Sequence, residues 1–251
     1  MDALYAFMRV TDDLADEPGE RQHQRDALTA WQEQLTAALA GTYTHPLHAA
    51  LHHTVVKYQI PETCLYEVIA GVRRDLDPMT FTSFQDLRSY CYQVASVVGI
   101  ACISIWGYRG TEALIYAEAA GIAFQLTNIL RDLAEDLNQG RIYLPHEDLA
   151  RFQSFPHTWR QRNESFRLLM RFEIERARQF YAEGRKLIPC LSPAGKAIFQ
   201  AMTGIYQQIL NEIENADYNV FEAKIRVPRW RKLRTMLGAL PTRWGLTWPH
   251  I

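Results

Sequence analysis

The stretch QLTNILRDLAEDLNQGRIYLP, residues 125–145, decides how the rest of the chain is interpreted. Its apolar residues recur with the spacing of an α-helix, up to the glycine and proline near its end. Gln125, Asn128, Asp132 and Asp136 are spaced by three, four and four. At about 100° per residue they share one helical stripe roughly 80° wide. Like charges four residues apart destabilise an isolated helix, so the two aspartates need a compensating partner.

The remainder of the chain also has a helical pattern, with hardly any of the alternation that is typical of strands. Glycine and proline residues interrupt it at intervals typical of helix–helix connections. We predict helices near residues 1–17, 20–40, 46–58, 62–75, 83–106, 111–138, 160–187, 193–222 and 229–238. No interruption is long or polar enough to be a linker. Residues 1–251, of which 48% are hydrophobic, are therefore expected to form a single all-α domain.

The composition excludes several classes of protein. The formal net charge is −1, whereas a nucleic-acid-binding protein would need a basic surface. The four cysteines have no CxxC or metal-like spacing and are typical of core residues in a reducing compartment. The N-terminus lacks the pattern of a signal peptide, and the most apolar run, 92–108, is short and interrupted by Gly99. We expect a cytoplasmic protein, soluble or peripheral to the inner face of the membrane.

A second acidic stretch lies near the N-terminus, in YAFMRVTDDLAD, residues 5–16. Tyr5, Arg9, Asp12 and Asp16 are spaced by four, three and four, so they also share one face of a helix. Asp13 lies beside this stripe. Two helices that each carry a pair of aspartates four residues apart suggest one common chemistry.

If the two acidic helices face each other, they form the two sides of a cation site. Mg²⁺ takes one or two carboxylates and completes its shell with water and substrate phosphates. It would neutralise a leaving diphosphate, and Arg9 and Arg131 would add charge-assisted hydrogen bonds. A single pair of this kind is usually a solvated helix face, and Arg9 also has the spacing of a surface ion pair with Asp13. From spacing alone, a solvated surface and a metal-lined pocket both remain open.

Three blocks of sequence together resemble the squalene/phytoene synthase family, in particular its bacterial presqualene diphosphate synthases and phytoene synthases. They are YAFMRVTDDLAD at 5–16, YCYQVASVVG at 90–99 and FQLTNILRDLAEDLNQGRIYLP at 124–145. The resemblance extends from residue 1 to about residue 235 in the order and spacing of these blocks. It implies an isoprenoid synthase fold, an all-α helical bundle around a central cavity.

The resemblance also implies a reaction, the Mg²⁺-dependent head-to-head condensation of two prenyl diphosphates. We expect two farnesyl diphosphates to give presqualene diphosphate or a squalene-type C30 product, with NADPH required if the product is reduced. The alternatives are a phytoene synthase, which joins two geranylgeranyl diphosphates to a C40 product, and a non-catalytic assembly factor of the same fold. Substrate length, the stopping point and the oligomeric state are not determined by the sequence.

The resemblance assigns roles to individual residues. The metal ligands it implies are Asp12, Asp13, Asp16, Asp132 and Asp136. The substrate-binding residues it implies are Arg9, Gln125, Asn128 and Arg131. The catalytic group would comprise Arg131, Tyr5 and Tyr90 at the reaction centre, where aromatic rings can stabilise a carbocation through the ring face, and Tyr206 near the diphosphate site. Without the resemblance, Tyr90 and Tyr206 would be interpreted as core residues of amphipathic helices, whereas segment 92–106 is implied to line a dry channel for the prenyl chains.

The two ends of the chain are open to further interpretation. Met1 stands just before the first acidic block, and we expect the chain to lack the helix that the family usually carries upstream. The segment KIRVPRWRKL, 224–233, is either a solvated edge or a diphosphate-facing patch, with Lys224 and Arg226 both candidates for the basic position. The C-terminal Trp248 would either rest on a membrane surface or pack in the core.

Overall fold

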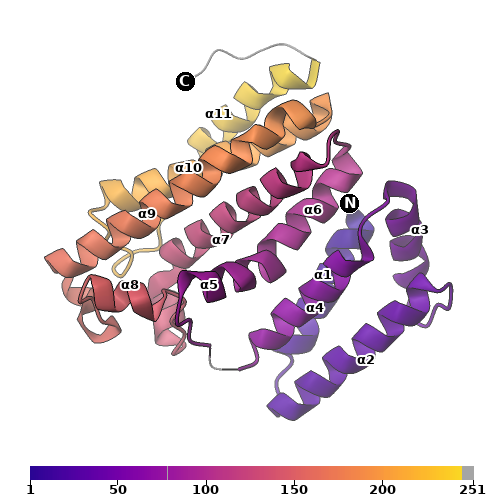
Figure 1. The fold of residues 1–251 in the computed structure, drawn as a ribbon, viewed down its shortest axis with the longest axis horizontal. Coiled ribbons are helices and arrows are strands. Elements are labelled where there is room, and N and C mark those ends of the chain that lie inside the picture. Colours follow the sequence, from indigo (N-terminus) through magenta and orange to yellow (C-terminus); the bar gives the residue numbers. More distant parts are fainter. Residues whose placement is uncertain (78, 245–251) are drawn as a thin grey trace.

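A computed structural model describes residues 1–77 and 79–244, which form an all-helical protein (Figure 1). Trp248 lies outside the described residues. The first half of the chain contains α1 (Asp2–Asp16), α2 (Arg21–Leu39), α3 (His48–Tyr58), α4 (Glu62–Arg74), α5 (Phe84–Cys91), the π-helical turn η1 (Tyr92–Ser96) and α6 (Val97–Trp106). The second half contains α7 (Glu112–Asn138), α8 (His146–Arg151), α9 (Glu164–Gly184), α10 (Pro193–Asn215), α11 (Arg229–Ala239) and three 3-10 segments, η2 (Pro156–Gln161), η3 (Arg185–Cys190) and η4 (Leu240–Trp244).

The all-α prediction is confirmed, and most predicted helices agree with the structure to within a few residues. The predicted helix 160–187 starts only at Glu164, because the side chain of Asn163 caps its first turn by accepting a bond from the Phe166 amide at 2.9 Å. The predicted helix 193–222 ends early, because Asp217 and Tyr218 have positive φ angles of 51° and 60°. The short α8 was missed because six residues carry too little periodicity.

The long helix α7 lies at the centre of the fold and contacts α5, α6, α9 and α10. Its small residues permit very close packing. A Cβ atom on Gly121 would lie only 2.4 Å from Cα of Ser96, so α7 touches the backbone of η1 there. On another side, a Cβ on Gly184 of α9 would lie 2.9 Å from Cα of Ala120. The predicted helix 83–106 therefore contains a π-helical turn where it crosses α7, and such turns are frequent at functional sites.

Two hydrophobic cores flank the middle of the molecule. Figure 1 shows α1–α4 on one flank and α9–α11 on the other, with α6 and α7 between them. The first core joins α1–α4 to α6, and the second joins α5 and α7 to α9 and α10. Phe124 of α7 packs against both cores and so marks the boundary between them.

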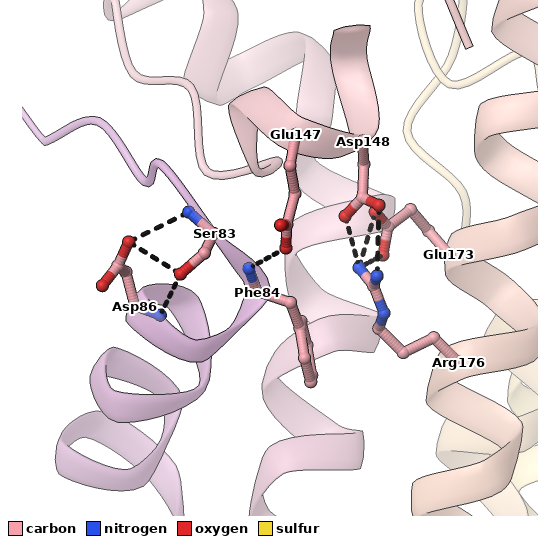
Figure 2. A network of polar contacts seen from close by, with 7 residues as sticks. All are labelled: Ser83, Phe84, Asp86, Glu147, Asp148, Glu173 and Arg176. Atoms are coloured by element: carbon pink, nitrogen blue, oxygen red, sulfur yellow. Dashed lines mark hydrogen bonds and ion pairs between the residues drawn. The ribbon is translucent and has the colours of Figure 1, made fainter. Parts of the chain in front are cut away.

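The short helix α8, which follows the loop after α7, is fastened to the body of the protein by a buried ionic cluster (Figure 2). Asp148 of α8 and Glu173 of α9 both accept bonds from Arg176, whose Nη1 lies 2.8 Å from each carboxylate. Next to Asp148, the Glu147 side chain accepts a bond from the Phe84 amide at the start of α5. The short helix α8 is thereby held against both α5 and α9.

Two helical stretches, Phe84–Trp106 and Glu112–Asn138, are long and apolar enough to cross a membrane by length and composition alone. Both pack in the middle of the fold, and 61% of the most apolar window of the second is buried. Buried core helices pass the same test, so these stretches are weak evidence for membrane spans.

Candidate active site

A largely apolar cavity of about 210 Å³ lies between the two cores. One face of the segment from Val94 to Trp106 lines it, as the resemblance implied for the wall of the channel. The rest of the lining comes from α7, α10 and Leu187 of η3. Three of the predicted site residues lie together on this cavity, namely Gln125, Asn128 and Tyr206. Carbocation chemistry needs such an apolar, water-poor space next to a few polar groups.

Asn128 presents an unused hydrogen-bonding group at this cavity. Among the residues that the structure describes, its buried Oδ1 atom has no partner, and its Nδ2 atom makes only a long 3.5 Å contact with Gln125. Buried polar atoms without partners are rare because they cost free energy. Asn128 therefore has free hydrogen-bonding capacity for a ligand.

Tyr206 lies where the apolar cavity meets the charged end of α7. Its ring packs against Phe124 with a centroid distance of 4.8 Å. The pKa of Arg131 is raised chiefly by the hydrogen bond that Arg131 donates to Asp132, and the nearby Tyr206 hydroxyl adds to this rise. An aromatic face at this boundary is suited to stabilise a cation without reacting with it.

Asp132 is half-buried and fully paired with basic groups. Arg131 Nε donates to its Oδ1 at 3.0 Å, and Lys224 Nζ lies 3.3 Å from the same oxygen. Burial acts to raise the pKa of Asp132, but the hydrogen bond and charge of Arg131, with Lys224, lower it overall. Lys224 Nζ also lies 2.8 Å from Glu135 Oε2, so Lys224 rather than Arg226 is the basic residue that faces the second acidic block.

Asp136, one turn further along α7, lacks this compensation. Burial, and then the charge of Asp132, raise its pKa to about 6. Arg141 acts in the opposite direction, while Glu135 and Asp75 add to the rise. Asp136 is therefore a carboxylate that is short of positive charge.

The first acidic block divides into two parts. Arg9 and Asp13 form an ion pair of 2.7 Å with both side chains largely exposed, which is the surface pair that their spacing also allowed. Asp12 instead has a raised pKa, because of burial and the charge of Asp16, with Arg9 acting against them. Asp12 and Asp16 therefore crowd each other as Asp132 and Asp136 do on α7.

Asp75 connects the two acidic blocks, and the sequence analysis missed it. It caps the C-terminal end of α4, and burial raises its pKa, with a further contribution from the charge of Asp12. Asp75 in turn contributes to the raised pKa of Asp136. Aspartates of both predicted blocks thus lie near one carboxylate. The sequence feature that could have identified Asp75 is its acidic side chain at the C-terminal end of a predicted helix, where the helix dipole disfavours a negative charge.

The two remaining tyrosines are not part of the cavity lining. Tyr90 is only 3% exposed, and its hydroxyl donates to Asp75 Oδ1 at 2.8 Å. Its ring stacks on Tyr143 with a centroid distance of 5.5 Å. Tyr5 is 69% exposed on α1. The structure therefore gives Tyr90 the position of a buried support for Asp75 and gives Tyr5 that of a surface residue.

The donor set fits Mg²⁺ bound together with a phosphate ligand. Within residues 1–77 and 79–244, no three acidic, histidine or cysteine side chains converge closely enough to hold a metal alone. Mg²⁺ needs only one or two carboxylates when phosphate oxygens complete its shell. The raised pKa values of Asp12 and Asp136 identify two carboxylates that such a cation would stabilise.

Comparisons with known proteins show the family of this chain. The family model for squalene/phytoene synthases matches residues 1–231. A phytoene synthase of Arthrospira platensis is 37% identical over 246 residues, which cover 92% of this chain and 80% of the relative.

Solved structures show the same similarity. A squalene synthase of Alicyclobacillus acidocaldarius is 32% identical, with a TM-score of 0.81 over 86% of this chain and 82% of its own. A dehydrosqualene synthase solved with a ligand is 28% identical, with a TM-score of 0.86 over 97% of this chain and 86% of its own. The family match over most of the chain decides the assignment. This chain belongs to the squalene/phytoene synthase family.

Proposed function

We propose that this protein condenses two molecules of geranylgeranyl diphosphate head to head, with Mg²⁺, to a C40 product. The observation that carries the proposal is the position of Asn128 and Tyr206, where an apolar cavity meets the charged end of α7. A substrate with a long apolar chain and a diphosphate head group needs both environments at once. The reaction type follows from the family, and the length of the chain is the finer part of the proposal.

The acidic residues would hold the head group. Asp132 and Asp136 on α7, with Asp12 and Asp16 on α1, would bind Mg²⁺, which supplies the charge that neutralises the leaving diphosphate. Arg131 and Lys224, now paired with Asp132, are close enough to exchange that carboxylate for phosphate oxygens. Asn128 would accept or donate a hydrogen bond at the boundary of the cavity.

The apolar residues would protect the reacting carbons. The carbon–oxygen bond of one substrate breaks, and its electron pair leaves with the diphosphate. The double bond of the second substrate then attacks the allylic cation, and loss of a proton closes a cyclopropane ring. A second ionisation, rearrangement and proton loss would give the linear product. Tyr206 and Phe124 offer ring faces beside these cations, while the remaining lining excludes water.

The choice of a C20 substrate rests on sequence relatives. The sequence analysis favoured two C15 substrates, but relatives named as phytoene synthases are 35–37% identical to this chain. A C30 product remains the second candidate, because of the squalene synthase whose structure is 32% identical. The non-catalytic alternative has less support, since a protein without this reaction has no use for two pairs of crowded carboxylates.

The test is incubation of the full chain with Mg²⁺ and labelled geranylgeranyl or farnesyl diphosphate, with and without NADPH. Products are identified by mass. We expect a C40 product without NADPH, and no product from Asp132→Asn. A C30 product from farnesyl diphosphate alone would refute the C20 assignment. Failure to consume either substrate, in a protein that is folded by circular dichroism, would refute the proposed reaction.

A further inference from the structure

The helix α11 has an exposed apolar face on the outside of the molecule. Trp230 is 60% exposed, and Leu233 and Leu237 are each 54% exposed. Met236 and Leu240 are also exposed. At about 100° per residue these five side chains fall within roughly 120° of the helix circumference. Solvent-exposed apolar stripes of this kind are typical of interaction surfaces.

The opposite side of α11 explains why this face points outward. Gln208 Nε2 of α10 donates to Thr235 Oγ1 at 2.7 Å, and Arg231 forms an ion pair with Glu212. A Cβ on Gly204 would lie 2.7 Å from Thr235 Cγ2, so the two helices approach closely here. Figure 1 shows α11 as the outermost helix, beyond α10. The polar side of α11 is therefore fixed against the body, and the apolar side is turned away from it.

Basic residues surround the exposed face. From Lys224 to Arg234 the chain has six basic residues and no acidic one, although its overall charge is only −1. Lys232 and Arg234 lie on either side of the apolar stripe by helical angle, and both are exposed. Neither has an acidic partner within 4 Å among the residues that the structure describes. Long basic side chains at the edges of an apolar stripe are typical of helices that lie in a membrane interface.

The face also adjoins the cavity. The contacts Glu212–Arg231 and Gln208–Thr235 show that α10 and α11 run in opposite directions, so Met202 lies near the C-terminal end of α11. Met202 lines the cavity and is itself 37% exposed. The cavity and the exposed face of α11 therefore lie close together at Met202.

We propose that α11 docks on an anionic lipid bilayer, with its apolar stripe among the acyl chains and its basic residues at the head groups. The charge favours this occupant, because each Lys or Arg near an anionic surface contributes attraction that a neutral surface lacks. The proposal is independent of the reaction, since lipid binding requires neither Mg²⁺ nor turnover.

The test is flotation of the full chain with vesicles of equal parts phosphatidylglycerol and phosphatidylcholine, or of phosphatidylcholine alone. We expect binding to the anionic vesicles that weakens as salt is added. The double variant Leu233→Ser/Leu237→Ser should bind at least about tenfold more weakly, and Lys232→Gln/Arg234→Gln about tenfold more weakly. The matched control, Val56→Ser/Ile115→Ser, removes two apolar side chains that are equally exposed elsewhere and should bind like the wild type.

Two outcomes would overturn the proposal. One is binding by the Leu233→Ser/Leu237→Ser variant at the level of the wild type. The other is a failure of the wild type to bind anionic vesicles, which would mean that something else covers the face. That occupant would be either a second copy of the chain or the C-terminal residues. Equilibrium sedimentation separates these two occupants, because only a second copy doubles the mass. An inactive Asp132→Asn protein should bind vesicles normally, so failure of the reaction and failure of docking are distinguishable.

Discussion

Two acidic clusters in this protein use the same kinds of side chain for opposite purposes. In the first, the inner cluster, Asp148 and Glu173 are almost fully buried and share the guanidinium of Arg176. This guanidinium also lies 4.1 Å from the centroid of the Phe84 ring (Figure 2). In the second, the outer cluster, Asp132 and Asp136 stand half-buried near the C-terminal end of α7, and Asp136 lacks a basic partner within 4 Å in the described part of the chain. The inner cluster is complete as folded, whereas in the outer cluster Asp136 is left without a counter-charge, which the proposed Mg²⁺ would supply.

The comparison teaches that burial of a carboxylate alone does not identify a binding site. Glu173 has its pKa raised to about 8, chiefly by burial, and that of Asp136 is raised to about 6, again chiefly by burial. What separates them is geometry. Arg176 satisfies both carboxylates of the inner cluster. The outer cluster instead lies one helical turn from Asn128, which lines the cavity and whose Oδ1 has no partner among the described residues.

The largest effect is expected when the inner cluster loses the positively charged guanidinium of Arg176. Arg176→Met leaves two buried carboxylates without a counter-charge, which should lower the free energy of unfolding by about 3–5 kcal/mol. Chemical denaturation measures this value. The control is Arg178→Met on the same helix, whose partner Glu214 is partly exposed, and which should cost less than about 1 kcal/mol. Equal losses for the two variants would contradict the distinction between buried and surface pairs.

The same chemical change in the two clusters should have opposite consequences. Asp136→Asn should lower kcat/KM about a hundredfold or more, because a ligand for the cation is lost. Its melting temperature without Mg²⁺ should not fall, since the variant relieves repulsion from Asp132. Asp148→Asn should leave the chemistry unchanged while lowering stability by about 1–3 kcal/mol. Steady-state kinetics and thermal melting of both variants check these expectations, and a stability loss in Asp136→Asn would break the comparison.

The stability of the protein should also depend on pH in two separate windows. A carboxyl whose pKa is higher in the folded state binds its proton more tightly there, so stability falls as pH rises through the window between the two values. For Asp136 this window lies between 3.8 and about 6, and for Glu173 between 4.5 and about 8. We expect Glu173→Gln to remove the loss at higher pH, while Asp136→Asn removes part of the loss at lower pH.

Mg²⁺ provides the control for this prediction. Added with diphosphate, it should reduce only the loss attributed to Asp136, because the inner cluster is closed to solvent. Melting curves recorded from pH 4 to pH 9, with and without these ligands, measure both effects. A Mg²⁺-dependent change that persists in Asp136→Asn but disappears in Glu173→Gln would reverse the assignment.

The fold was predictable because its signals are local. Apolar spacing defines the face of α7, and glycine and proline residues mark most helix ends. The pairs Asp12–Asp16 and Asp132–Asp136 were also local, since residues four apart share a helix face. What the sequence did not show was the relation between elements. The π-helical turn arises where Ser96 meets Gly121 of another helix, and no pattern within residues 83–106 encodes that contact.

The same limit applies to the candidate site. Asp75 and Arg141 come from connections rather than from periodic helices, and they reach the acidic residues only through tertiary packing. Tyr90 was singled out by resemblance, yet its hydroxyl points to Asp75 and its ring packs in the core. Lys224 was one of several candidates in a basic run, and only its distances to Asp132 and Glu135 distinguish it.

The smallest expected effect concerns Lys224, which lies in the segment before α11 and contacts Asp132 of the outer cluster. Lys224→Met removes an exposed pair, so the melting temperature should change by about one degree or less. KM for the prenyl diphosphate should rise about threefold, because the amine near Asp132 is no longer available to phosphate oxygens. Lys186→Met, which removes a similar exposed pair with Glu183, is the control and should leave KM unchanged. An unchanged KM in Lys224→Met would mean that this lysine only balances the charges of Asp132 and Glu135. The carboxylates of the outer cluster, like those of the inner one, would then be neutralised in part by a basic side chain of the protein itself.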